Sequence, residues 1–171
     1  MILTGSEIVA AREHGEIIIE PFEQHLVNPN SYNYRLAPRL LLPHGEEYPD
    51  DEQALEIPGD GLVLEPQRLY LASTFEILGS RSYAMSLIGR SSIGRLGLFL
   101  QVSANLGHVG SAHAWTLELI AAKPIRLYPR MRIGQISFWM CKGEAVPYSA
   151  GYSRFNVATP SKWRSGKEVG K

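Results

Sequence analysis

Short apolar segments alternate with turn-forming or charged residues from Gly61 towards the C-terminus. We expect strands at seven of these segments, at residues 62–64, 69–74, 83–88, 98–103, 114–121, 125–127 and 133–140. Many short strands with no long helical segment between them are typical of an antiparallel sandwich or barrel. The pattern therefore predicts a mainly β protein.

The first twenty residues carry the signals of one short helix followed by a strand. Thr4 and Glu7 have the spacing of a capping box, and Gly15 is a natural helix stop. These signals predict a helix over Ser6–His14. The apolar run Ile17–Ile19 predicts a strand directly after it.

The pattern is less regular between this strand and Gly61. After a turn signal at residues 28–31, the segment Tyr32–Leu36 is rich in strand formers and leads towards Leu40–Leu42. The acidic segment Pro43–Pro58 has little periodicity, so we expect it to be a solvated excursion. At 171 residues the chain fits one domain, assigned to residues 1–160, with a polar C-terminal tail at 161–171.

Composition and charge narrow the class of function. Seventeen basic and seventeen acidic residues give a formal net charge of zero, so attraction to a nucleic acid polymer or an anionic membrane is not expected. The apolar runs are too short to span a membrane, and the N-terminus has no signal-peptide pattern. The single cysteine, Cys141, excludes an intramolecular disulfide and a cysteine-rich zinc site. A cytoplasmic protein is expected.

The stretch from Gly89 to Leu98 concentrates the candidate chemistry. It holds Arg90, Ser91, Ser92 and Arg95 among three glycines. Arginine forks and short hydroxyl side chains bind phosphate oxygens, and small residues let the backbone approach a ligand. No phosphate-loop pattern of the Walker or Rossmann type is present, so a glycine-rich turn with solvated arginines remains the alternative.

Glu118 is the second informative position. Alternation along residues 114–120 places Trp115, Leu117 and Leu119 on one face of the predicted strand, and Glu118 on the other. A carboxylate there either faces solvent or lies in a pocket, where it would serve as a general base or acid. The residues alone leave both readings open.

The segment Arg-Ser-Ser-Ile-Gly-Arg-Leu-Gly-Leu at 90–98 closely resembles the signature of dCTP deaminases, which are members of the trimeric dUTPase-like superfamily. Residues 30–36 look like the family's early strand, which usually ends Asp-x-Arg-Leu, and Thr116–Leu119 looks like its catalytic strand. Residues 129–138 resemble the late strand, while 147–148 and 159–162 resemble the C-terminal arm. The resemblance covers nearly the whole chain.

This resemblance implies a distorted, jelly-roll-type β-barrel that forms a homotrimer with an active site at each subunit interface. The implied reaction is the hydrolytic removal of ammonia from C4 of a cytosine nucleotide, without zinc. The sequence agrees, because the His-x-Glu and Pro-Cys-x-x-Cys pattern of zinc deaminases is absent.

The family's mechanism also implies roles for individual residues. Glu118 would take a proton from water and deliver it to the pyrimidine N3, while Ser91 and the backbone carbonyl of Ala104 hold that water. Arg95 would orient the carboxylate and balance its charge.

The phosphates are expected to bind to Arg90 and Ser92, with Tyr148 closing over the nucleotide from the arm. Magnesium would be coordinated by the nucleotide phosphates and would need no protein side chains as ligands.

The chain departs from the family at the sugar. His108 replaces the Asp that contacts the 3′-hydroxyl, Ser111 replaces a sugar-packing aromatic residue, and Gly107 replaces a bulky aliphatic residue. We expect these changes to enlarge or re-polarise the sugar pocket, although His108 and His113 also have the ordinary reading of histidines in a turn. The arm lacks the family's Lys and Gln, for which Arg154 is the candidate substitute.

These departures separate three functions. Loss of the Asp disfavours dUTP diphosphatase activity, in which the family uses it to activate water. Retention of the catalytic side chains favours deamination of dCTP or a related cytidine nucleotide. A non-catalytic trimer that binds a nucleotide is the alternative.

Overall fold

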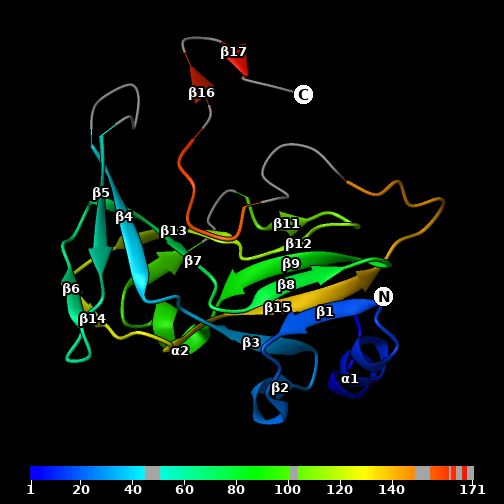
Figure 1. Ribbon diagram of the computed structural model, residues 1–171. Helices are drawn as coiled ribbons and strands as arrows, with labels where there is room; N and C mark the ends of the chain where they lie inside the picture. The colour runs from blue at the N-terminus through cyan, green and yellow to red at the C-terminus, as the bar shows by residue number, and fades with distance from the viewer. Residues whose placement is uncertain (45–50, 101–103, 149–154, 162, 165–166, 169–171) are drawn as a thin grey trace.

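Two five-stranded antiparallel sheets form the body of the protein in a computed structural model (Figure 1). The structure describes residues 1–44, 51–100, 104–148, 155–161, 163–164 and 167–168. One sheet has the order β11 (Leu106–Gly107), β9 (Tyr83–Gly89), β15 (Arg132–Met140), β3 (Ser31–Arg35) and β2 (Val27–Asn28). The other has the order β10 (Leu98–Leu100), β13 (Thr116–Ala121), β7 (Leu69–Ser73), β4 (Arg39–His44) and β5 (Asp51–Glu56).

Smaller elements complete the described fold. A three-stranded sheet has the order β1 (Ile17–Glu20), β8 (Ile77–Ser80) and β12 (Ala112–His113). Two further pairs are β14 (Ile125–Leu127) with β6 (Leu62–Leu64), and β16 (Trp163–Arg164) with β17 (Lys167–Glu168). The helical elements are α1 (Gly5–Glu13), the 3₁₀ turn η1 (Gln24–Leu26) and the single turn α2 (Ser91–Gly94). The predicted mainly β class with a short N-terminal helix is confirmed.

One hydrophobic cluster joins the two large sheets. Met85 and Phe138 from the first sheet and Leu117 and Leu119 from the second are fully buried members of it. Burial of such side chains is the main favourable contribution to folding. Both sheets therefore bury their inner faces in the same core.

The N-terminal helix begins where its capping signal placed it, within one residue. The Thr4 hydroxyl accepts a hydrogen bond from the Glu7 amide at 3.4 Å, and Gly15 adopts a left-handed φ of 74° just after the helix. Thr4 thus satisfies one of the free amides of the first turn. The predicted strand after it is also confirmed, as β1.

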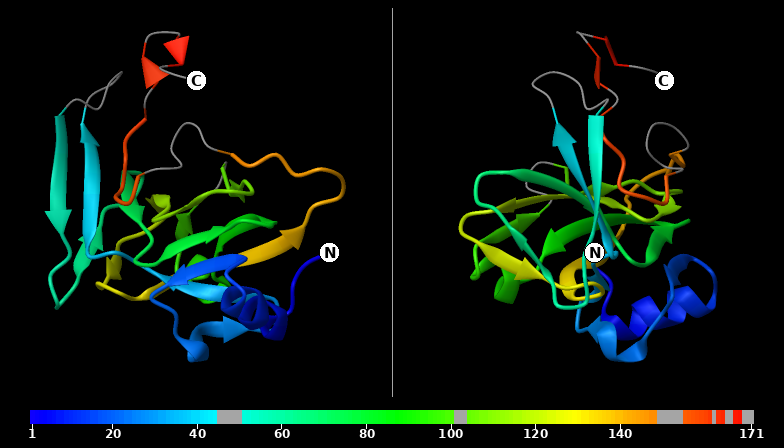
Figure 2. Two further views of the ribbon diagram at one scale, coloured as in Figure 1. Left: turned by 45° about the vertical axis from the view of Figure 1, so that its right-hand side comes forward. Right: turned by 60° about the vertical axis from the view of Figure 1, so that its left-hand side comes forward.

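The acidic segment Pro43–Pro58, predicted to be a solvated excursion, contains a strand that the sequence pattern did not indicate. Residues 51–56 form β5, which pairs in register with β4 from Arg39↔Glu56 to His44↔Asp51. Figure 2 shows this hairpin standing away from the body of the fold. Weak periodicity hid the strand because β5 is an edge strand, and edge strands tolerate charged residues that protect them from further pairing.

A buried ion pair fixes the end of β3. The carboxylate of Glu76, 0% exposed, accepts hydrogen bonds from the Arg35 amide at 2.8 Å and from Arg35 Nε at 2.6 Å. Arg35 also contacts Glu23. These contacts hold β3, which carries polar residues of the site described next, against the segment between β7 and β8.

Candidate active site

The glycine-rich stretch folds as the single turn α2 between β9 and β10. Arg90 precedes the turn in an extended conformation, Ser91 and Ser92 begin it, and Arg95 follows it. Ile93 is 7% exposed and anchors the turn in the core. Ser91 and Ser92 are exposed, so their hydroxyls are available to a ligand.

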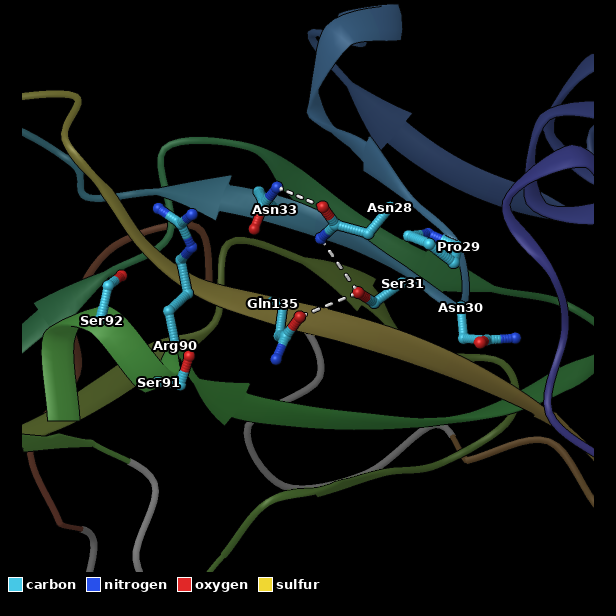
Figure 3. A pocket seen from close by; sticks show the side chains of 9 residues that line it. All are labelled: Asn28, Pro29, Asn30, Ser31, Asn33, Arg90, Ser91, Ser92 and Gln135. Carbon is cyan, nitrogen blue, oxygen red and sulfur yellow. Dashed lines mark hydrogen bonds between the residues drawn. The ribbon is translucent and has the colours of Figure 1, made fainter. Parts of the chain in front are cut away.

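A polar pocket of about 350 Å³ lies beside this turn (Figure 3). Its lining comes from three parts of the chain: residues 28–31 and Asn33, the turn residues Arg90–Ser92, and Gln135 of β15. Among these lining residues Arg90 is the one with a charged side chain, and none is acidic. Partial burial and the nearby Arg132 lower the pKa of Arg90 from its ordinary value. A cation in a pocket lined by uncharged polar groups suits an anionic ligand.

Sequence reasoning predicted Arg90, Ser91 and Ser92, but it missed the polar residues opposite them. Asn28, Ser31 and Asn33 lie on or between β2 and β3, and Gln135 lies on the neighbouring strand. Hydrogen bonds join them, including one of 2.9 Å from Ser31 Oγ to Gln135 Oε1 across 104 positions of sequence. One signal in the sequence could have indicated these pocket residues: polar side chains stand at alternate positions of segments that otherwise consist of strong β-formers.

Glu118 lies in the middle of β13, opposite Leu71 of β7, and is partly buried. Leu117 and Leu119 on either side are fully buried. The predicted alternation is therefore confirmed. Glu118, Arg95 and Ala104 do not belong to the lining of the Arg90 pocket, so that pocket holds only part of the predicted site.

The structure brings His108 and Tyr148 together. Their ring centroids are 5.0 Å apart, and the Tyr148 amide donates a 2.7 Å hydrogen bond to the carbonyl of Val109. Gly110 has a φ of 92°, and a Cβ there would lie 2.9 Å from Pro147 Cβ. The turn between β11 and β12 is therefore covered by residues 147–148 of the same chain.

Gly107 leaves no free space beside it within the subunit. A Cβ at this position would lie 3.0 Å from both Met85 Cβ and Trp115 Cη2, so neighbouring side chains fill the space. Ser111 is only 2% exposed. Loss of bulk at these two positions is compensated by packing within the subunit, because well-packed interiors leave few voids.

His113 is buried against the root of the C-terminal arm. Its ring lies 4.2 Å from that of Trp115, Nδ1 lies 3.0 Å from the Ala114 carbonyl, and the backbone of Phe155 supplies a second hydrogen bond. Burial lowers the pKa of His113, and the two backbone hydrogen bonds partly offset that effect.

Two further contacts hold the arm against the start of β13. Asn156 Oδ1 accepts from the Ala114 amide, and the Thr159 amide donates to Thr116 Oγ1, both at 3.1 Å. The candidate Arg154 lies outside the described residues.

An exposed apolar row crosses the outer face of the second sheet. Phe99, Ile120 and Leu69 lie opposite one another on β10, β13 and β7, and they are 48%, 41% and 43% exposed. Ile120 is on the same face of β13 as Glu118. Three adjoining exposed apolar side chains of this size are typical of an interaction site.

Two other kinds of site are absent from the described residues. No helix there is long and apolar enough to cross a membrane. The same part of the chain contains no group of three or more His, Cys, Asp or Glu residues placed to hold a metal ion.

Comparisons with known proteins identify the family. A protein-family model described as dCTP deaminase-like matches residues 2–141. A protein of Clostridium botulinum named "dCTP deaminase, dUMP-forming" is 44% identical over 94% of this chain and 95% of its own length. A protein of the same name from Leptospira biflexa is 42% identical over 91% of each chain.

A solved structure shows the same fold. The crystal structure of 2′-deoxycytidine 5′-triphosphate deaminase from Agrobacterium tumefaciens superposes with a TM-score of 0.66 at 23% identity. The match covers 82% of this chain and 48% of that longer one. With the family model matching residues 2–141 and relatives above 40% identity along almost their whole length, the chain belongs to the dCTP deaminase-like family.

Proposed function

We propose that this protein is an enzyme that hydrolytically deaminates a cytosine nucleotide, dCTP or a close relative of it, to the uracil nucleotide and ammonia. Its relatives are named dCTP deaminases. The observation that carries the proposal is the Arg90–Ser92 turn, which opens on a polar pocket, in a chain that also retains Glu118 on β13.

Glu118 is the general base and acid of the proposed reaction. Its carboxylate takes a proton from water while the water oxygen bonds to C4, and the proton passes to N3. The remaining hydroxyl proton then passes to N4, the C4–N4 bond of the tetrahedral intermediate breaks as ammonia leaves, and C4 becomes a carbonyl. Ser91 and the Ala104 carbonyl hold the water, and Arg95 balances the carboxylate charge. All of these steps use side chains and backbone of the protein without a catalytic metal.

Arg90 and Ser92 bind the phosphates, and Tyr148 covers the nucleotide. Magnesium enters with the nucleotide, bound to its phosphate oxygens. The lining of the pocket supports the binding of phosphates by Arg90 and Ser92 and of magnesium by the phosphates alone. It offers amides, hydroxyls and a guanidinium, but no carboxylate for a divalent cation.

The active site lies between subunits of a homotrimer. The pocket beside α2 lacks Glu118, and the exposed row Phe99–Ile120–Leu69 on the face of Glu118 supplies an apolar surface for a second subunit. Covering that row would remove it from water and place the carboxylate in a closed environment.

Deamination of dCTP alone gives dUTP, whereas deamination with cleavage of the triphosphate gives dUMP. The relatives' names specify dUMP, which requires release of diphosphate in addition to ammonia. His108, at the position of the family's aspartate, disfavours that second step here. Chromatography of the product separates dUTP from dUMP and settles which reaction the chain performs.

Ammonia release from dCTP, CTP, dCMP, CMP and deoxycytidine with magnesium tests the proposal. Turnover of one nucleotide that disappears in Glu118→Gln and persists in Glu13→Gln, an exposed control at the end of α1, supports it. Binding of nucleotides without turnover of any of the five would instead support a non-catalytic binding protein.

Subunit mixing tests the shared site. Glu118→Gln and Ser91→Ala are each expected to be inactive alone. If one subunit supplies Ser91 and its neighbour Glu118, random re-assembly of equal amounts into cyclic trimers restores about a quarter of the sites. Absence of any recovery would place both residues in one subunit.

A further inference from the structure

A β-bulge near the start of β15 determines which face of the sheet Arg132 occupies. The pairing of β15 with β3 shifts register between Arg132 and Gly134, so Ile133 is an extra residue on β15. Ile133 and Gly134 are both buried. An extra residue shifts the alternation of faces by one position. Arg132 therefore lies on the same face of the sheet as Gln135, which lines the polar pocket, although an odd number of positions separates them.

Like charges surround Arg132 on this face. Arg132 stands opposite Arg35 on the neighbouring strand β3, a placement in which two like charges destabilise a sheet. Arg90 approaches from the α2 turn, with its Nη1 3.5 Å from the carbonyl oxygen of Arg132. Partial burial, followed by the charge of Arg132, lowers the pKa of Arg90. Three arginines therefore lie close together where β15 begins.

Carboxylates neutralise only one of these three arginines within the described residues. Arg35 forms ion pairs with Glu76 at 2.6 Å and with Glu23. In the same part of the chain no carboxylate lies within 4.0 Å of the guanidinium of Arg90 or Arg132. Arg132 is also exposed. Two uncompensated cations beside a pocket suit a ligand that carries several negative charges.

The two uncompensated arginines differ in their position relative to the pocket. Arg90 lines it together with Ser91 and Ser92, whereas Arg132 lies outside the lining. A phosphate held inside the pocket contacts Arg90. The phosphates that follow it in a polyphosphate chain extend past this arginine and come within reach of the next one.

We propose that Arg132 is a specificity-determining residue that binds the outer phosphates of the nucleotide and so selects triphosphates over monophosphates. The inference rests on the proposed function for the identity of the nucleotide. It goes beyond that function by assigning the number of phosphates that the site selects to one residue outside the pocket lining. The planar guanidinium of arginine offers two parallel N–H donors to two oxygens of one phosphate.

Arg132→Gln removes this charge, and Arg130→Gln is its matched control. Arg130 is exposed and lies two positions away, so both variants lose the same charge from the same short segment. The Arg130 guanidinium lies over the ring of Phe75, 4.8 Å from its centroid, and Arg130 does not line the pocket. The difference between the two variants therefore measures the position of the charge.

Steady-state kinetics of the full-length protein on dCTP test the proposal. Loss of a charge-assisted contact predicts that Arg132→Gln raises KM about tenfold, with kcat changed by less than about threefold. Arg132→Lys is expected to recover part of this loss, because it restores the charge without the planar fork. Arg130→Gln is expected to keep KM within about twofold of the wild type. Equal KM values for Arg132→Gln and Arg130→Gln would overturn the proposal.

Calorimetric titration measures the selection without turnover. Arg132→Gln is expected to bind inorganic triphosphate about tenfold more weakly than the wild type does, and to bind dCMP within about twofold of the wild type. An equal loss of affinity for both ligands would show that Arg132 does not distinguish outer phosphates from the first one, and would contradict the proposal.

The failure of this inference is distinguishable from the failure of the proposed function. If Arg132→Gln alone weakens triphosphate binding in a protein that deaminates no cytosine nucleotide, the proposed function fails and the assignment of Arg132 stands. If the wild type deaminates dCTP and the two glutamine variants behave alike, the inference fails alone.

Thermal melting without ligand separates binding from support of the fold. Because Arg132 faces like charges, Arg132→Gln is expected to melt at the wild-type temperature or above it, at one protein concentration. Inorganic triphosphate should then raise the melting temperature less in this variant than in the wild type. A lower melting temperature without ligand would show that Arg132 supports the fold, and would contradict the proposal.

Discussion

The pocket beside α2 and the turn between β11 and β12 are built in opposite ways. The pocket is lined by amides and hydroxyls held by hydrogen bonds across distant parts of the chain, and it stands open in a single subunit. The turn is closed, with His108 against Tyr148 and the space beside Gly107 filled by Met85 and Trp115. The pocket is thus preorganised, whereas the space beside the turn is occupied by the subunit's own side chains.

Glu118→Gln is expected to have the largest effect, because it removes the chemistry and leaves both regions intact. Loss of a general base and acid predicts a fall in kcat of at least about 10²–10⁴-fold with nucleotide affinity retained. Single-turnover ammonia release together with equilibrium binding measures both quantities. Activity within tenfold of the wild type would move the catalytic role away from Glu118.

Arg90→Gln affects the pocket alone. Removal of the one charged side chain in the lining is expected to raise KM for dCTP by about tenfold to a hundredfold, with Arg90→Lys recovering part of the loss. The loss should be smaller for deoxycytidine, which has no phosphates. The same loss of affinity for both ligands would show that Arg90 does not bind phosphate.

His108→Asp changes the turn alone. Returning the family's residue is expected to raise the preference for dCTP over 2′,3′-dideoxycytidine triphosphate by about tenfold, because a hydrogen bond to the 3′-hydroxyl is regained. The ratio of kcat/KM for the two nucleotides measures the change. An unaltered ratio would mean that packing against Tyr148 keeps residue 108 away from the sugar.

The smallest effect is expected from pH at His113, which joins the turn to the arm. Because burial lowers its pKa from the ordinary 6.5, the docked arm favours the neutral imidazole. Docking is therefore fully stable above pH 6.5 and weakens as pH falls from 6.5 towards the lower docked pKa. Hydrogen exchange at the Thr159 amide, which donates to Thr116, reports this change. A pH profile identical in His113→Gln would rule out His113 as its source.

Local signals in the sequence predicted local features well. The Thr4 cap, the Gly15 stop and the alternation around Glu118 depend on neighbours within a few residues, and the structure confirms each. The strand β5 was missed because its acidic sequence shows little alternation of apolar and polar residues. Its pairing with β4 is made by backbone hydrogen bonds, which leave no such pattern in the sequence.

The missed half of the pocket has a different cause. Asn28 and Gln135 meet only because β15 pairs with β3, and nothing in either segment indicates the other. The packing at Gly107 was also inaccessible, since a missing side chain predicts space only if its neighbours are known. The family resemblance supplied roles for Arg90 and Ser91, but not the residues that surround them.

The exposed row of Phe99, Ile120 and Leu69 has a thermodynamic consequence. If a second subunit covers this row, as proposed, association links folding to mass action, and the apparent melting temperature should rise with protein concentration. Dilution then lowers the stability of the folded subunit together with the population of the assembly. An isolated subunit exposes an apolar sheet face to water. The concentration of this protein would therefore help to determine how long each molecule stays folded.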